Sequence, residues 1–109
     1  MKQGEELAQL ITTLPGEDQA LELARAVVEE RRGACVQVLG PITSVYRWEG
    51  DVRTEREFLC LMKVPAAALD DLVEFVRARH PYTTPELAAL TGPYVDPAYM
   101  AWARQEVQQ

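Results

Sequence analysis

The side chains of this sequence that could bind a metal ion are few: two cysteines, Cys35 and Cys60, and one histidine, His80. A cysteine thiolate is a soft ligand for Cu(I), and an imidazole is a possible partner for it. A closed four-ligand zinc site would also need several carboxylates or a second chain. Each residue has a structural alternative. A free cysteine is usually a small buried hydrophobe, as we expect for Cys60, and a histidine before Pro81 can cap a helix end.

Residues that carry enzymatic chemistry do not form a recognisable group. Ser44 is the only serine and lacks the Gly-x-Ser-x-Gly context of a nucleophile elbow. The chain has neither a P-loop nor a dinucleotide-binding glycine motif. Glu86 and His80 could exchange protons, but no nucleophile accompanies them. We therefore predict a binding protein and not an enzyme.

The hydrophobic pattern predicts the elements that must position these residues. Strands are expected at residues 7–13, 34–39, 42–48, 52–64 and 86–90, with a kink at Gly40-Pro41 and a hairpin tip at residues 49–51. One helix begins at Glu17 and ends at the glycine stop Arg31-Arg32-Gly33. A second helix begins at Pro65 and ends at His80, and a third is capped by Asp96-Pro97.

The helical period also predicts which side chains are buried. In the first helix, residues 20, 21, 24, 27, 28 and 31 form the expected apolar stripe, which includes Leu21 and Val28. In the second helix the stripe is Leu69, Leu72, Val73 and Val76. The order strand–helix–strand, repeated and followed by a helix, predicts a single domain over residues 1–109. Its fold is expected to be an α+β, ferredoxin-like βαββαβ sandwich with a long hairpin between the second and third strands.

Both faces of the predicted central strands are apolar, although two helices can cover only one of them. Leu59 and Leu61 alternate with Cys60 and Met62, whereas a solvated face would carry polar residues. The first arm of the hairpin would span about 50 Å if extended, and an isolated two-stranded ribbon is marginal in water. We therefore predict self-association. The alternative is that the third helix covers the bare face.

Four aromatic side chains, each with a polar atom, are predicted to anchor the contact between copies: Tyr46, Trp48, Tyr99 and Trp102. Tyr46 and Trp48 belong to the predicted ribbon, where full exposure of two large rings would be unusual. We prefer this role to ligand stacking.

The charge balance narrows the possible partners. Seventeen acidic residues against eleven basic ones give a net charge of −6, which argues against nucleic acid and anionic membranes. No apolar run reaches the ~20 residues of a membrane helix. The first six residues include two acids where a signal peptide would be apolar. We therefore expect a cytoplasmic location.

Several segments follow one another at the spacing of a known family: GACVQV (33–38), SVYRWEG (44–50), FLCLMK (58–63), HPYTTPEL (80–87) and PAYMAW (97–102). From Leu10 to Arg104 the chain resembles the CutA family, the divalent-cation tolerance proteins. The resemblance implies a ferredoxin-like homotrimer similar in architecture to PII signalling proteins, with a role in tolerance of copper and other divalent cations.

The resemblance also implies positions for the sites. Cys35 matches the family's cysteine, so that Cys35 and His80 are the predicted ligands of copper or another divalent cation. Lys63, Tyr82 and Glu86 are expected around one cleft between subunits, as ligand-binding groups or as a structural hydrogen-bonded network. One alternative function is a PII-like trimer that binds a small anion or nucleotide in these clefts through Lys63 and Arg79. Another is a scaffold for an unknown protein partner.

Overall fold

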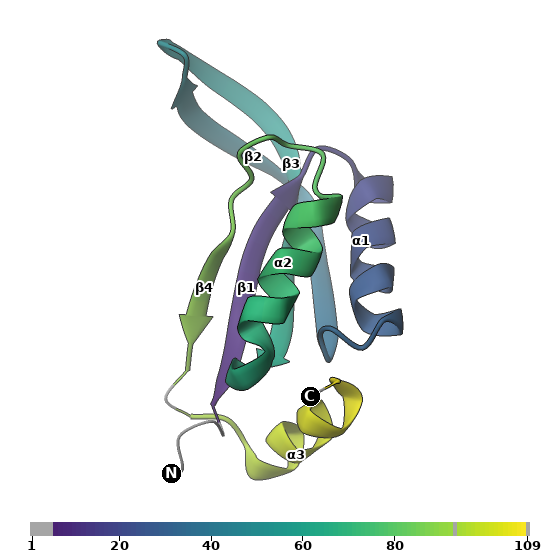
Figure 1. Ribbon diagram of the computed structural model, residues 1–109. Coiled ribbons are helices and arrows are strands. Elements are labelled where there is room, and N and C mark those ends of the chain that lie inside the picture. Colours follow the sequence, from purple (N-terminus) through teal and green to yellow (C-terminus); the bar gives the residue numbers. More distant parts are fainter. Residues whose placement is uncertain (1–5, 93, 109) are drawn as a thin grey trace.

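The computed structural model describes residues 6–92 and 94–108 (Figure 1). The strands are β1 (Leu7–Leu14), β2 (Cys35–Trp48), β3 (Asp51–Pro65) and β4 (Ala88–Thr91). The helices are α1 (Glu17–Glu29), α2 (Leu69–Arg79) and α3 (Pro97–Glu106), with a 3₁₀ turn, η1 (Ala66–Ala68), before α2. Pro93, expected in the turn after the last strand, lies outside the described residues. None of the described helices is long and apolar enough to cross a membrane.

The strands form one antiparallel sheet in the order β2-β3-β1-β4. Helices α1 and α2 lie side by side on one face of this sheet, and α3 lies at the end of the sandwich remote from the hairpin tip (Figure 1). This arrangement confirms the predicted ferredoxin-like α+β fold. The last strand begins later than predicted, because its pairing with β1 starts at Ala88, opposite Ile11. Glu86 is consequently part of the loop between α2 and β4.

The core fills the space between the sheet and the two helices. Leu10, Met62 and Val64, which alternate along their strands, are fully buried on this side. From α1, the buried residues are Ala20, Leu23, Ala24 and Val27, and from α2 they are Leu72, Phe75 and Val76.

The predicted stripe of α1 was wrong at three positions, since Arg31 is exposed and lies beyond the end of the helix. Leu21 and Val28 are 51% and 44% exposed, whereas Leu23 is buried. Each residue turns a helix by about 100°, so Leu21 and Val28 lie at the flank of a face centred on Ala20, Leu23 and Val27. The pattern therefore located the helix correctly but set its orientation one residue off.

The end of α1 also differs from the predicted stop at Gly33. The helix ends at Glu29, and Arg31 takes the left-handed conformation (φ 58°) that glycine usually provides. The Arg32 N–H then donates to the Val27 carbonyl at 2.9 Å. Gly33 serves a different purpose, because a Cβ atom at this position would lie 2.7 Å from Cγ1 of Val27.

The second and third helices begin close to their predicted positions. Pro65 ends β3 and is followed by η1, so α2 itself begins four residues later, at Leu69. His80 ends α2 as predicted, with an extended backbone (ψ 137°). The Asp96 carboxylate caps α3 by accepting two backbone N–H groups of its first turn, which confirms the predicted cap.

The outer parts of β2 and β3, residues 42–57, extend beyond the sheet as a two-stranded ribbon (Figure 1). A bulge between Leu39 and Ile42 separates the ribbon from the body, where the sequence predicts a kink. Glu49 and Gly50 form the turn at the tip, with φ values of 51° and 85°. Positive φ at both positions is typical of a type I′ turn. Asp51, predicted in the tip, pairs with Trp48 and belongs to β3.

The face of the sheet opposite α1 and α2, here called the outer face, carries a group of incompletely covered aliphatic side chains beside the polar pair Lys63 and Gln37. Leu39 and Leu90 are 46% and 63% exposed, and Ile11, Leu59 and Leu61 are half-buried. Helix α3, whose buried residues are Met100 and Ala103, lies at the end of the sandwich and not along this face (Figure 1).

Candidate functional site

A groove of about 760 Å³ lies where the ribbon meets the loop between α2 and β4. One face of the ribbon lines it with Tyr46, Trp48, Arg53, Glu55 and Glu57, and Val45 of the other face borders it as well. Apart from Val45, these residues share a face because alternate positions of paired strands point to the same side. The loop closes the other side with Tyr82 and Glu86, so the structure brings these two predicted cleft residues together.

Two tyrosine hydroxyls in the groove donate hydrogen bonds to carboxylates. The Tyr46 hydroxyl donates to Oε1 of Glu55 at 2.6 Å, and the Tyr82 hydroxyl donates to Oε2 of Glu57 at 2.8 Å. The bond to Glu55 raises the pKa of Tyr46, and burial together with Glu57 raises the pKa of Tyr82. Both phenols therefore stay protonated at neutral pH and hold the two carboxylates in place.

His80 connects this groove to β1. Its Nε2 lies 2.9 Å from the carbonyl oxygen of Thr13 and 3.1 Å from Oγ1 of Thr12, and the Tyr82 N–H donates to its Nδ1 at 3.1 Å. A carbonyl can only accept and an N–H can only donate, so these contacts assign the proton to Nε2 and leave Nδ1 as the acceptor. The imidazole is therefore neutral, and burial correspondingly lowers its pKa.

These contacts limit His80 as a metal ligand. Metal coordination requires an imidazole nitrogen with a free lone pair. Nδ1 already accepts the Tyr82 N–H, and Nε2 carries the proton that it donates. His80 would have to release one of these partners before it could bind a metal ion.

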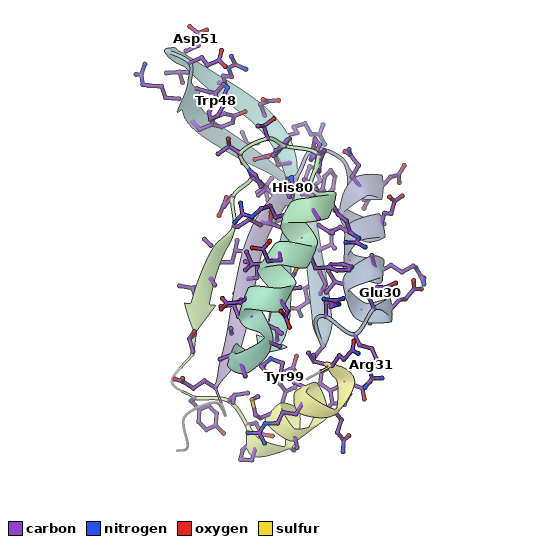
Figure 2. The ribbon with its side chains drawn as sticks, in the orientation of Figure 1. Glu30, Arg31, Trp48, Asp51, His80 and Tyr99 are labelled. Atoms are coloured by element: carbon purple, nitrogen blue, oxygen red, sulfur yellow. The ribbon has the colours of Figure 1, made fainter. Side chains whose placement is uncertain are left out.

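Cys35 lies far from His80. Cys35 begins β2, pairs with Lys63 and is half-buried. The pKa of Tyr99 is raised, chiefly by burial and secondly by the nearby Cys35 thiol. Figure 2 shows His80 near the base of the ribbon and Tyr99 at the opposite end of the molecule. The structure therefore does not bring Cys35 and His80 together within one chain. Among residues 6–92 and 94–108, no three His, Cys, Asp or Glu side chains are grouped to hold a metal ion.

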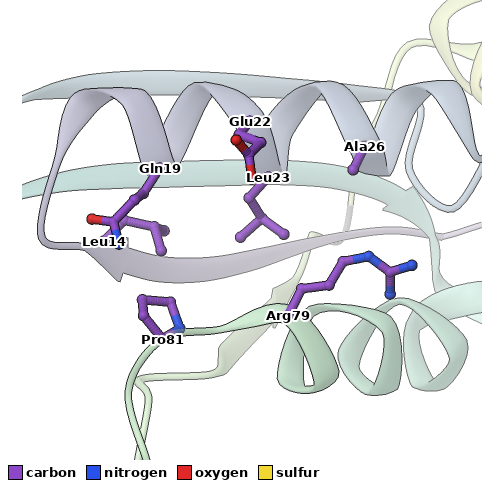
Figure 3. A pocket seen from close by; sticks show the side chains of 7 residues that line it. All are labelled: Leu14, Gln19, Glu22, Leu23, Ala26, Arg79 and Pro81. Atoms are coloured by element: carbon purple, nitrogen blue, oxygen red, sulfur yellow. The ribbon is translucent and has the colours of Figure 1, made fainter.

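The cationic side chains expected near a cleft are engaged elsewhere. Lys63 does not line the groove, and its Nζ donates to Oε1 of Gln37 at 2.8 Å. The Arg79 guanidinium lies 3.7 Å from the centre of the Phe75 ring. Arg79 also borders a smaller hollow of about 290 Å³ between α1 and α2, together with Leu23 (Figure 3). The structure thus separates Lys63 and Arg79 from Tyr82 and Glu86.

The residue types and their spacing did not predict Arg53, Glu55 and Glu57 as part of the site. Their alternation along β3 was a signal that they share a face with Tyr46 and Trp48. The signal that Glu57 is buried, with only 8% of its surface exposed, was absent from the sequence. Its burial depends on the loop that carries Tyr82.

The charges that line the groove indicate which ligands it disfavours. Three carboxylates, from Glu55, Glu57 and Glu86, face one guanidinium, from Arg53. An excess of negative charge opposes the binding of a phosphate or nucleotide. The fold and the groove thus define a class: a ferredoxin-like α+β protein with an acidic, aromatic groove beside a long ribbon.

Comparisons with known proteins specify the family. The profile of the family described as "CutA1 divalent ion tolerance protein" matches residues 8–106, and the chain belongs to this family. A divalent-cation tolerance protein CutA from Thermus thermophilus is 42% identical over 96 residues, which are 88% of this chain and 93% of the relative. The CutA protein of Mus musculus is 42% identical over 93 residues, 85% of this chain, and the match spans only 52% of the mouse protein.

Solved structures agree with the family assignment. The crystal structure of CutA1 from Oryza sativa has a TM-score of 0.91 at 33% identity, with 95% of each chain covered. The family's description refers to tolerance of divalent ions and not to an enzymatic reaction. The compartment varies among relatives, since a rice protein is named chloroplastic and a structure from Archaeoglobus fulgidus is named periplasmic.

Proposed function

We propose that this chain acts in divalent-cation tolerance as a non-catalytic binding protein that assembles as a homotrimer. The observation that carries the proposal is the outer face of the sheet, where Leu39 and Leu90 are 46% and 63% exposed beside three half-buried aliphatic side chains. A group of exposed aliphatic side chains on one sheet face typically marks a contact with another protein. Another copy of the same chain is a suitable partner for this face, because it is always present at the same concentration.

The ribbon supports self-association independently. Val45 and Val52, on the ribbon face opposite Tyr46 and Trp48, are 65% and 64% exposed. A two-stranded ribbon is marginal without a surface to pack against. A neighbouring copy that covered the valine face would stabilise the ribbon by burying these side chains.

The predicted aromatic anchors fit this assembly. On α3 the rings of Tyr99 and Trp102 contact each other in a tilted arrangement, with their centres 5.3 Å apart, and both are more than a third exposed. We place this pair at the contact with a neighbouring copy. Tyr46 and Trp48 would lie at its edge, where the groove opens between subunits.

Cys35 is the proposed ligand for copper. Its thiol is half-buried next to the exposed outer face, so a neighbouring copy could bring further ligands to it. Cys60 is unsuitable because it is fully buried and burial raises its thiol pKa to about 11. His80 would join the site only after losing its bond from Tyr82. Two free cysteines also support a cytoplasmic location, where thiols stay reduced.

The assembly and the metal site are tested separately. Light scattering on the purified protein is expected to give three times the mass of the chain, and a stable monomer at micromolar concentration would contradict the trimer. Anaerobic calorimetry with Cu(I) is expected to show binding to the wild type and to Cys60→Ala, the matched control, but not to Cys35→Ala. Equal heats for all three proteins would remove Cys35 from the site.

A further inference from the structure

The groove beside the ribbon has the size of a small-molecule site. Its volume of about 760 Å³ lies within the range of roughly 300–1,000 Å³ that is usual for ligand pockets. Its lining residues in this structure come from one chain, and Cys35, the proposed metal ligand, is not among them. What the groove binds is therefore a question separate from copper.

The walls of the groove combine aromatic rings with negative charge. Three rings, from Tyr46, Trp48 and Tyr82, border it together with the carboxylates of Glu55, Glu57 and Glu86. Arg53 supplies the only positive charge among the described lining residues. A cation on the face of an aromatic ring is attracted by the ring's negative potential, and a nearby carboxylate adds to this attraction.

The hydrogen bonds strengthen this combination. Tyr46 and Tyr82 donate their hydroxyl protons to Glu55 and Glu57, at 2.6 and 2.8 Å. Donation to a carboxylate increases the electron density of a phenol ring, which favours a cation on its face. Glu57 is fixed in turn, because Tyr82 is held by His80 and the carboxylate is only 8% exposed. The groove is therefore organised before any ligand arrives.

The geometry points to this groove as a binding site for a small organic cation that carries an alkylated ammonium group. Such a ligand places its charge among the carboxylates and its alkyl groups against the rings. A bare metal ion would gain little from the rings, and the described carboxylates are not clustered to coordinate one. An anion would be repelled.

Fluorescence of Trp48 provides the test. The chain has two tryptophans, so Trp102→Phe leaves Trp48 as the single reporter, at 42% exposure in the groove. Choline is the cationic probe, 3,3-dimethylbutan-1-ol is its neutral isostere, and 4,4-dimethylpentanoate is an anion of similar shape. Choline is expected to change the Trp48 emission saturably and to bind about fivefold or more tightly than the neutral alcohol. Equal affinity for choline and the alcohol, or tighter binding of the anion, would overturn the proposal.

Matched variants assign the binding to the groove. Glu57→Gln keeps the shape of the side chain and its acceptor for Tyr82, and Glu86→Gln removes an exposed charge of the same groove. Each is expected to weaken choline binding about fivefold, whereas Glu22→Gln, on α1 outside the groove, leaves it unchanged. If Glu57→Gln fails to fold, Glu86→Gln alone decides. Unchanged affinity in the groove variants would refute the site. Light scattering in parallel shows whether assembly has changed, which separates this result from a failure of the proposed trimer.

Discussion

Lowering the pH from 7.5 to 5.5 should destabilise this protein through its single histidine. In the folded chain the Tyr82 N–H donates to Nδ1 of His80 and Nε2 donates to Thr13, so the hydrogen bonds require the neutral imidazole. Burial lowers the pKa of His80, although Thr13 and the charge of Glu57 partly oppose this shift. The unfolded chain, with a histidine pKa near about 6.5, therefore takes up the proton first as the pH falls.

The sign of the change in stability follows from the difference between the pKa of His80 in the folded and in the unfolded chain, and its size from the hydrogen bond that is lost. Where the unfolded state binds more protons, the free energy of unfolding falls as the pH falls, so the loss begins as the pH passes below about 6.5. Protonating Nδ1 in the folded state would replace an acceptor with a donor facing the Tyr82 N–H. Losing this hydrogen bond and leaving its donor unpaired costs on the order of 1–2 kcal/mol. The free energy of unfolding should therefore fall by no more than this amount.

Denaturant unfolding at pH 7.5, 6.5 and 5.5, at one protein concentration, measures this decrease. His80→Gln is the control, because glutamine can donate to Thr13 and accept from Tyr82 without titrating. Its free energy of unfolding should change little over this range, apart from the onset of carboxylate protonation shared by both proteins. A wild-type curve that is flat or rises on acidification, or equal slopes in the two proteins, would refute the assignment of the neutral imidazole.

Three further predictions concern local structure. Gly33→Ala should lower the free energy of unfolding by about 1–3 kcal/mol, because the new Cβ would lie 2.7 Å from Cγ1 of Val27. Thermal or denaturant unfolding measures this change, and an unchanged stability would contradict the clash. Asp96→Ala should cost about 1 kcal/mol by removing the α3 cap, and Asp96→Asn, which keeps an acceptor, should cost less. In a thiol-labelling time course on the native protein, Cys35 should react well before Cys60, whose burial raises its pKa to about 11; simultaneous labelling would argue against that burial.

The sequence predicted those parts of the fold that depend on neighbouring residues. The caps at His80 and Asp96 were predicted because a proline next to each restricts the backbone locally. The stripe of α1 failed at Leu21 and Val28 because apolar side chains at the flank of a helix are indistinguishable, by spacing alone, from those at its centre. Only the packing of α1 on the sheet selects Leu23 instead.

The candidate site depends on contacts between distant segments, and its prediction was correspondingly partial. Tyr82 and Glu86 lie in one loop, and the structure places both in the groove. Glu57 is 25 residues from Tyr82 and joins the site only because the ribbon leans against that loop. Lys63 pairs with Cys35 on the outer face and does not line the groove of a single chain, so its place in a cleft between subunits stays a prediction.

The two faces of the ribbon allow the two proposals to hold in one assembly. Val45 and Val52 point to one side, and Tyr46 and Trp48 point to the other, because neighbouring residues of a strand alternate. A neighbouring copy packed on the valine face would stiffen the ribbon and would reach the groove only at its edge, where Val45 borders it. Because this contact would hold the ribbon that carries Tyr46 and Trp48, self-association would support ligand binding on the opposite face rather than compete with it.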